Sequence, residues 1–330
     1  MQTETKLVGD LKTADKHAAY DASVKRLLAN REILAWIMKD CVEEFKNCTI
    51  KDIAEKYIEK DPEISSTAVN PDETNRAETE SITGMNTEDK SVNEGTVYYD
   101  IRFFAAAPGS GQTIKLIINI EAQNDYYPGY PLIKRGLYYC GRMLSAQYGT
   151  EFVGGHYENL KKVYSIWICS HPPKEEQNAI TKYAIGETFL MGNASEKREN
   201  YDMLSVIMVN LSENFDTSSG KMIDLLGVML LSKEEPQQRA DIIHRDYGIT
   251  ITRELEGEVS LMCNLSQGLI REGEARGISI GEAKGKILGA VQMGHDIGLT
   301  DNDIITKIID KFSITREEAE KYLAEALSAN

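Results

Sequence analysis

The sequence predicts an α/β fold in which helices flank a mixed central sheet and a helical C-terminal extension follows. Two β-rich runs, 98–106 and 114–120, are separated by the turn-forming residues 108–111, which together predict a β-hairpin. The apolar run 163–169 predicts another strand. Helical periodicity dominates from Lys221 onward. These observations favour a core domain over 1–215 and a helical region over 216–330.

The remaining elements of the core follow from periodicity. Residues 20–45 carry an apolar stripe at helical spacing, and 50–58 form a shorter amphipathic piece. Residues 60–96 read as an acidic loop insertion, with room for a short strand near 63–69. A helix over 130–148 and a strand over 204–211 complete the core.

Composition narrows the class of protein. The five cysteines are odd in number and lack CxxC spacing, which disfavours a disulfide framework and a zinc ribbon and suits a reducing cytoplasm. No run of about 18 apolar residues is present, so we expect no membrane association. The chain is predicted to be a globular, cytoplasmic protein.

Charge is unevenly distributed along this acidic chain, whose formal net charge is −15. Residues 59–96 hold ten acidic and three basic side chains, whereas 98–182 hold nine basic and seven acidic ones. Phosphate binding needs local positive charge. Five of these nine basic residues are therefore predicted to line a groove, with ordinary solvated surface as the alternative. They are Lys134, Arg135, Arg142, Lys161 and Lys162.

The predicted hairpin brings two carboxylates together. If its turn closes near residues 109 and 110, Asp100 lies opposite positions 119–121, within roughly 5–8 Å of cross-strand and diagonal neighbours. Glu121 and Gln123 are two apart in a strand and face the same side. Mg²⁺ prefers carboxylate and water ligands, so Asp100 and Glu121, with the carbonyl of Ala122, are candidate ligands. The alternative is a pair of solvated acids near strand ends.

The segments around these residues resemble the PD-(D/E)XK nuclease superfamily, in its recombination-promoting nuclease and transposase branch. In that branch Gln commonly replaces the lysine of the E-x-K strand, as in Glu121-Ala122-Gln123. The similarity spans roughly 20–173, and the C-terminal helix with glycine at every fourth residue is also familiar from this branch. The segments that carry it are Tyr20 to Lys25, Tyr98 to Arg102 and Lys134 to Tyr139.

The resemblance implies a restriction-endonuclease-like core and Mg²⁺-dependent (or Mn²⁺-dependent) DNA cleavage. Asp100 and Glu121 would hold the metal, and Gln123 would position water. Asp21 would add an outer carboxylate, although an N-cap of the first helix is the favoured alternative. Glu88, Asp89 and Glu94 precede the second strand and could also face the site, and a solvated acidic loop is the favoured alternative for them.

Behind the metal, Arg135 would contact a phosphate and Tyr139 would support Arg135 by packing or a hydrogen bond. Because Gln123 is a poor proton acceptor, the general base is left to solvent, the substrate phosphate or a distant lysine. Lys25 cannot be placed from sequence. Lys115 lies six residues before Glu121 on the same face, roughly 20 Å away by strand rise, which is too far.

Glycines recur every fourth residue from Gly273 to Gly289 on the long C-terminal helix. Each costs ~1 kcal/mol of helix stability relative to Ala, which favours packing against another helix and hence a homo-oligomer. A flexible tether is the alternative. Two rivals to the nuclease therefore remain: a catalytically inactive nuclease-fold protein that binds nucleic acid or assembles, and a purely structural protein built on this helix.

Overall fold

The computed structural model describes residues 2–59, 62–64, 88–91, 95–108, 113–212 and 220–328. The chain divides into two compact units, Met1–Leu265 and Ser266–Asn330. The helices are α1 Gln2–Leu28, α2 Arg31–Cys41, α3 Ile50–Asp52, α4 Leu132–Ser145, α5 Arg198–Tyr201, α6 Lys221–Leu230, α7 Pro236–Tyr247, α8 Arg253–Asp296, α9 Asp301–Phe312 and α10 Arg316–Ser328. Short 3-10 or π turns are η1 Glu43–Phe45, η2 Ile53–Tyr57, η3 Tyr157–Asn159 and η4 Lys174–Glu176.

A six-stranded mixed sheet forms the centre of the first unit, in the order β1-β4-β5-β6-β8-β7. Strands β5, β6 and β8 are parallel, while β1, β4 and β7 run antiparallel to their neighbours. A separate two-stranded sheet pairs β2 with β3. The strands are β1 Glu63–Ile64, β2 Glu88–Ser91, β3 Gly95–Tyr98, β4 Ile101–Pro108, β5 Thr113–Gln123, β6 Lys162–Cys169, β7 Ala179–Ala184 and β8 Leu204–Asn210. The predicted α/β class is confirmed.

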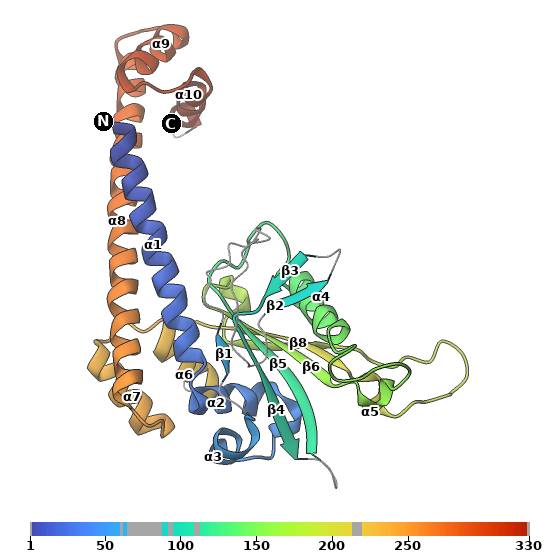
Figure 1. The fold of residues 1–330 in the computed structure, drawn as a ribbon. Coiled ribbons are helices and arrows are strands. Elements are labelled where there is room, and N and C mark those ends of the chain that lie inside the picture. Colours follow the sequence, from blue (N-terminus) through green and yellow to red (C-terminus); the bar gives the residue numbers. More distant parts are fainter. Residues whose placement is uncertain are drawn as a thin grey trace. The chain divides into compact units, whose positions relative to one another are not determined.

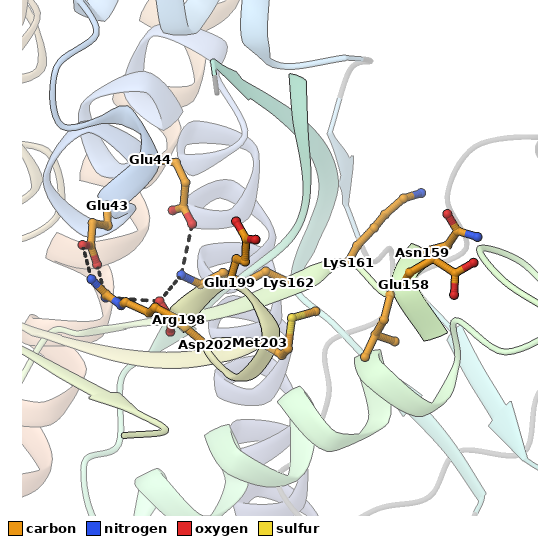
Figure 2. A pocket seen from close by; sticks show the side chains of 11 residues that line it. Glu43, Glu44, Glu158, Asn159, Lys161, Lys162, Arg198, Glu199, Asp202 and Met203 are labelled. Carbon is orange, nitrogen blue, oxygen red and sulfur yellow. Dashed lines mark hydrogen bonds and ion pairs between the residues drawn. The ribbon is translucent and has the colours of Figure 1, made fainter. Parts of the chain in front are cut away.

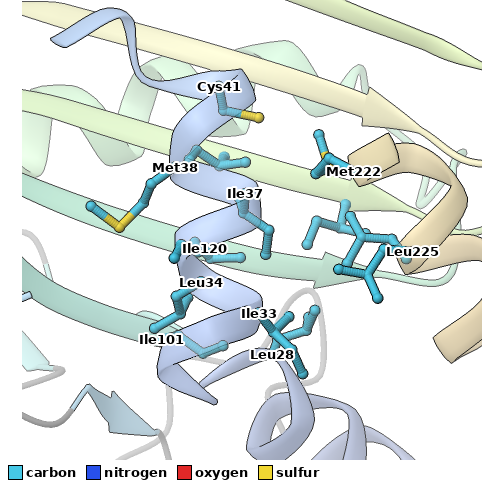
Figure 3. Packing of buried hydrophobic residues seen from close by; sticks show 14 of the residues in the cluster. Leu28, Ile33, Leu34, Ile37, Met38, Cys41, Ile101, Ile120, Met222 and Leu225 are labelled. Carbon is cyan, nitrogen blue, oxygen red and sulfur yellow. The ribbon is translucent and has the colours of Figure 1, made fainter. Parts of the chain in front are cut away.

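Helices cover both faces of the sheet (Figure 1). Helix α4 lies on one face, over a core that includes Ile117, Tyr139 and Trp167. The opposite face packs against α2 and α6, and Figure 3 shows Ile101 and Ile120 of the sheet beside the apolar side chains of both helices. Alternate residues of β4 and β5 therefore point into two separate apolar cores, as the two-residue period of a strand requires.

The predicted helix over 20–45 is two helices. α1 ends at Leu28, and Asn30 begins α2 by accepting hydrogen bonds from the main-chain N–H groups of Glu32 and Ile33. An asparagine side chain competes for backbone donors in this way, which favours a cap over a continuous helix. The first helix also begins far earlier than predicted, at Gln2.

Helices α6 and α7 belong to the first unit, together with the first part of α8. Their apolar side chains, such as Met222 and Leu226, lie in the same core as α2 and the sheet. The two compact units therefore divide at 265/266, whereas the predicted helical region begins at 216, because the helices after β8 cover the sheet. Most of the predicted acidic insertion, including 65–87, lies outside the described residues.

The second unit has its own apolar core between α8, α9 and α10, centred on Val291, Ile304 and Ala319. Side-chain caps mark the starts of α9 and α10. Thr300 accepts from the N–H of Asp303, and Thr315 and Glu318 exchange hydrogen bonds at the start of α10. None of the helices in the described ranges combines the length and apolarity that crossing a bilayer requires.

The glycines of α8 lead to a stability prediction. A Cβ on Gly281 or Gly285 would meet no heavy atom of the described chain within 4 Å. At protein concentrations low enough to keep the chain monomeric, we expect Gly281→Ala and Gly285→Ala each to stabilise the helix by up to ~1 kcal/mol, measured by thermal unfolding followed by circular dichroism. Gly294→Ala is the matched control and should destabilise, since its Cβ would lie 2.7 Å from Ile304 Cγ1. A loss of stability at Gly281 or Gly285 would contradict the prediction.

Candidate active site

The hairpin register brings Asp100 to Glu121. Ile101 pairs with Ile120, so Asp100 lies opposite Glu121 at the start of β4 and near the end of β5. The Asp100 N–H donates to Glu121 Oε1 at 3.1 Å, and the Ala122 N–H donates to Asp100 Oδ2 at 3.0 Å. Both acidic residues are more than nine-tenths buried. The predicted juxtaposition of the two carboxylates is confirmed, although the turn residues 109–112 lie outside the described ranges.

Helix α1 supplies two more charged groups. Lys25 Nζ lies 2.8 Å from Asp100 Oδ1 and 2.7 Å from Asp21 Oδ2, and the lysine side chain is only 2% exposed. Asp21 and Lys25 are four residues apart, so they share one face of the helix. The preferred interpretation of Asp21 as an N-cap is wrong, because α1 starts at Gln2 and Asp21 lies well inside the helix. Its carboxylate instead approaches the site through Lys25.

Burial controls the charge states of this cluster. Desolvation, and then the charge of Asp100, raises the pKa of Glu121 well above its usual range, against the opposing influence of Arg135. Desolvation also raises the pKa of Asp21, with Asp100 adding to the effect and Lys25 opposing it. Burial alone would lower the pKa of Lys25, but Asp100 and Asp21 outweigh it and the pKa is raised. Lys25 therefore carries a full positive charge at neutral pH.

The donor set suits a hard divalent cation. Consecutive strand residues direct their main-chain groups to opposite edges, and the N–H and C=O of one residue share an edge. Gln123 O accepts from Ser170 N on the β6 side, and the Ala122 N–H points to Asp100. The carbonyl of Ala122 therefore faces Asp100 too.

Two carboxylates and a carbonyl are enough for Mg²⁺, which keeps several waters. Within the described residues, no group of three or more His, Cys, Asp or Glu side chains is placed to hold an ion. Asp100, Glu121 and the Ala122 carbonyl do not form a closed protein cage, so they could hold Mg²⁺ only with waters completing its shell.

The Gln123 side chain, at the end of β5, contacts the loop that follows this strand. Its Nε2 donates to the main-chain carbonyl of Asp125 at 2.5 Å, just after β5 ends. The residue shares the face of Glu121, as predicted, but its amide is engaged with the 124–126 turn. A role for Gln123 in positioning water would need this hydrogen bond to be released.

Arg135 sits on an aromatic platform beside Glu121. Its Nε and Nη2 donate to Tyr139 Oη at 3.0 and 2.7 Å, and its Nη1 donates to Tyr130 Oη at 3.2 Å. The guanidinium carbon lies 5.1 and 5.4 Å from the ring centroids of Tyr139 and Trp167. The support of Arg135 by Tyr139 is as predicted. The contributions of Tyr130 and Trp167 were not predicted.

The other predicted basic residues separate. Lys134 is exposed on α4, whereas Arg142 is buried and packs against Tyr138, so Arg142 cannot reach a phosphate in this structure. Lys161 pairs with Glu151, and its ammonium lies 4.9 Å from the ring centroid of Phe104. Of the basic residues predicted to line a groove, only Arg135 and Lys134 therefore remain candidates for contact with a phosphate. The others are held by contacts away from Asp100 and Glu121.

Lys162 belongs to a pocket at the opposite end of the parallel strands, near the starts of β6 and β8 (Figure 2). The pocket holds about 520 Å³. Lys162 Nζ bridges Glu44 at 3.0 Å and Asp202 at 2.8 Å, and Arg198 joins Glu43 to Asp202. These ion pairs tie η1 to α5, which marks a structural network and not the continuation of the Asp100 site.

Three further candidates lie partly or wholly outside the described structure. Glu94 is outside the described residues, while only the backbones of Glu88 and Asp89 are described, in β2. The backbone of Lys115 pairs with Ala106, six residues along β5 from Glu121, and its side chain is not described.

Gly136 allows α4 to lie close to the sheet and thereby places Arg135. A Cβ at this position would fall 2.5 Å from Val206 Cγ1 and 3.0 Å from Trp167 Nε1. We expect Gly136→Ala to lower the free energy of unfolding by about 1–3 kcal/mol, as overpacking does, in urea denaturation. Gly141→Ala on the same helix is the control, since its Cβ meets nothing within 4 Å. Equal stability of the two variants would disprove the close-approach argument.

The main residue that sequence reasoning could not place is Lys25. Its signal was the four-residue spacing from Asp21, which predicts a shared helix face but not which strand that face meets. Comparisons with protein-family models, with curated proteins and with solved structures return no match to this chain.

Proposed function

We propose that this protein is a metal-dependent DNA endonuclease of the PD-(D/E)XK type, associated with recombination or transposition. The observation that carries the proposal is the buried pair of Asp100 and Glu121 at adjoining strand ends, joined by hydrogen bonds through the Asp100 and Ala122 N–H groups. Burying two acids side by side is costly unless a cation or a proton compensates them. The lysine of α1 compensates one of them, which leaves Glu121 as the natural partner of a metal ion.

In this proposal Asp100, Glu121 and the carbonyl of Ala122 hold Mg²⁺ or Mn²⁺. The bound cation supplies an activated water and neutralises charge on the phosphate oxygens. Asp100 also fixes Lys25 beside the site through their 2.8 Å ion pair. Arg135, held rigid by Tyr130 and Tyr139, contributes positive charge next to Glu121.

Lys25 supplies the positive charge of the lysine that Gln123 replaces in the E-x-K motif, but it does not act as a general base. Its pKa is raised by Asp100 and Asp21, so it holds its proton at neutral pH. A group of this kind stabilises negative charge that develops on the phosphate. The proton of the attacking water must then pass to solvent or to the substrate phosphate itself.

The decisive experiment is cleavage of supercoiled plasmid at low salt by the wild-type chain with Mg²⁺ or Mn²⁺, beside Asp100→Asn and Glu121→Gln. These substitutions keep the shape of the side chains, so loss of activity reports on charge. We expect metal-dependent nicking that falls by at least 100-fold in both variants. Glu158→Ala is the matched control, since this exposed acid lies in the pocket of Figure 2.

Equal cleavage by all four proteins would indicate a contaminating nuclease and reject the site. DNA binding without cleavage in any protein would favour the second candidate, a catalytically inactive nuclease-fold protein. One observation supports that candidate: both Asp100 oxygens already meet donors of the chain itself, Lys25 and the Ala122 N–H. A metal titration by calorimetry separates the two, because only the nuclease needs an ion at Glu121.

The proposed partners are DNA, contacted through Lys134 and Arg135, and further copies of the chain associating through the C-terminal helices. Cα atoms of the glycines on α8 leave an open stripe on which another helix can pack closely. The proposed compartment is the cytoplasm, in keeping with cysteines that are all free.

A further inference from the structure

Strand β7 forms one edge of the central sheet. It pairs antiparallel with β8, and within the described residues no strand covers its other edge. Natural edge strands are usually protected by proline, by bulges or by an outward lysine. β7 contains no proline. Its lysine, Lys182, forms an ion pair with Glu43, with 3.0 Å between Nζ and Oε2. Its apolar residues Ile180 and Tyr183 are about two-fifths exposed.

The segment 185–197, here called the β7 arm, continues from this edge and projects beyond the sheet near α5 (Figure 1, yellow-green). Every residue of the arm is exposed. The Glu196 N–H donates to Glu187 Oε1 at 2.8 Å and closes its base, and Gly192, with φ of +72°, turns the chain back. The arm therefore has a defined loop shape without a core of its own.

Three consecutive large apolar side chains stand at the tip of the arm. Leu190 is 96% exposed, Met191 is 94% exposed and Phe189 is about half exposed. Fully burying a Leu or Met side chain is worth about 1.5–3 kcal/mol, so leaving such residues in water forgoes considerable stability. A contiguous apolar patch of this kind marks an interaction surface.

We propose that the β7 edge and the β7 arm form the interface of a homodimer, in which β7 pairs antiparallel with β7 of a second copy. A strand paired antiparallel with its own copy has the two-fold symmetry that an isologous dimer requires. The main-chain groups of the outer edge find partners in this arrangement, and each arm covers apolar surface of the other chain. This interface is separate from the C-terminal helices and does not depend on nuclease activity.

The exposed apolar area of the β7 edge and the β7 arm approaches what a stable dimer buries. With about 200 Å² for each large side chain, the exposed portions sum to on the order of 700 Å² per chain, close to the ~800 Å² per partner of standard interfaces. The acidic chain, at −15, would repel an anionic membrane, which argues against lipid as the occupant. The side chains counted are Ile180, Tyr183, Ile185, Phe189, Leu190 and Met191.

The test is sedimentation equilibrium of the full chain from about 0.5 to 50 μM, comparing wild type with the double variant Leu190→Asp/Met191→Asp. Both positions are almost fully exposed, so the variant should fold, which circular dichroism verifies. We expect the wild type to self-associate, with a dissociation constant for the β7 interface that is at least 100-fold larger in the variant. Leu137→Asp, an exposed leucine of α4, is the matched control and should stay dimeric.

Hydrogen exchange tests the strand pairing itself. Amides of β7 should exchange slowly in the wild-type dimer and faster in the double variant, while those of the central strand β6 should not change. A monomeric wild type at all concentrations would overturn the proposal. So would a dimer that survives Leu190→Asp/Met191→Asp but is lost in Gly281→Leu/Gly285→Leu, since that result would assign association to α8 alone.

Discussion

Lys25→Met is expected to abolish DNA cleavage and to destabilise the first unit by about 3 kcal/mol. Lys25 is almost fully buried and bridges Asp100 and Asp21. Its removal leaves the Asp100 carboxylate buried without a countercharge, and breaking a buried pair typically costs 3–5 kcal/mol. Asp21 is 34% exposed and regains hydration, which places the estimate at the lower end of that range.

The two effects of Lys25 can be separated by a second substitution. In Lys25→Met/Asp100→Asn the uncompensated charge is gone, so most of the lost stability should return in urea denaturation. Cleavage should remain at least 100-fold below wild type, because the positive charge beside the phosphate and a metal ligand are both missing. The double-mutant cycle gives the coupling energy of the pair directly.

Lys25→Arg adds a control for charge alone. The guanidinium keeps the positive charge but is larger than the ammonium, and Lys25 is almost fully buried, so partial activity with reduced stability is expected. A Lys25→Met protein that unfolds and cleaves like wild type would show that the ion pairs contribute nothing, and the role assigned to Lys25 would be withdrawn.

The parts of the site that depend on local sequence could be predicted, and those that depend on packing could not. The two β-rich runs of the hairpin are adjacent in the sequence, so their antiparallel pairing, and with it the position of Asp100 opposite Glu121, could be predicted, because each strand residue has one opposite partner. The start of α10 is likewise a local feature, since the capping box of Thr315 and Glu318 spans three residues.

The contacts between elements far apart in the sequence could not be predicted. The helical spacing of Asp21 and Lys25 predicts that they share a face, but which strand that face meets depends on how α1 crosses the sheet. Arg142 follows the same logic: its spacing on α4 was compatible with a groove, and only the packing of the helix shows it to be buried. The sequence analysis did not predict β7, because the strand has only six residues and, being mostly exposed, lacks the apolar run of an inner strand.

Glu121→Gln is expected to stabilise the metal-free protein above acidic pH while removing its response to metal. Burial and the charge of Asp100 raise the pKa of Glu121 in the folded state, so the folded protein binds a proton more tightly than the unfolded chain. Stability then decreases as the pH rises from about 4.5 through the raised pKa. Each tenfold difference in proton affinity between the two states is worth about 1.4 kcal/mol.

The glutamine variant carries no ionisable group at this position, so its advantage over wild type should grow with pH across this window. Neighbouring groups do not mask the effect. Lys25 keeps its proton throughout, since its pKa is raised, and Asp21, whose pKa is also raised, is present in both proteins and cancels in the comparison.

A divalent cation should reverse the order of the two proteins. Bound metal favours the ionised Glu121, so Mg²⁺ should raise the melting temperature of wild type increasingly from pH 5.5 to 8.5 and leave Glu121→Gln nearly unchanged. Differential scanning fluorimetry in EDTA and in Mg²⁺ measures all four conditions. A wild type that gains nothing from Mg²⁺ or Mn²⁺ at any pH, with a variant of equal stability in EDTA, would mean that Glu121 is a structural acid. Metal binding would then not explain why the fold tolerates the free-energy cost of burying Glu121.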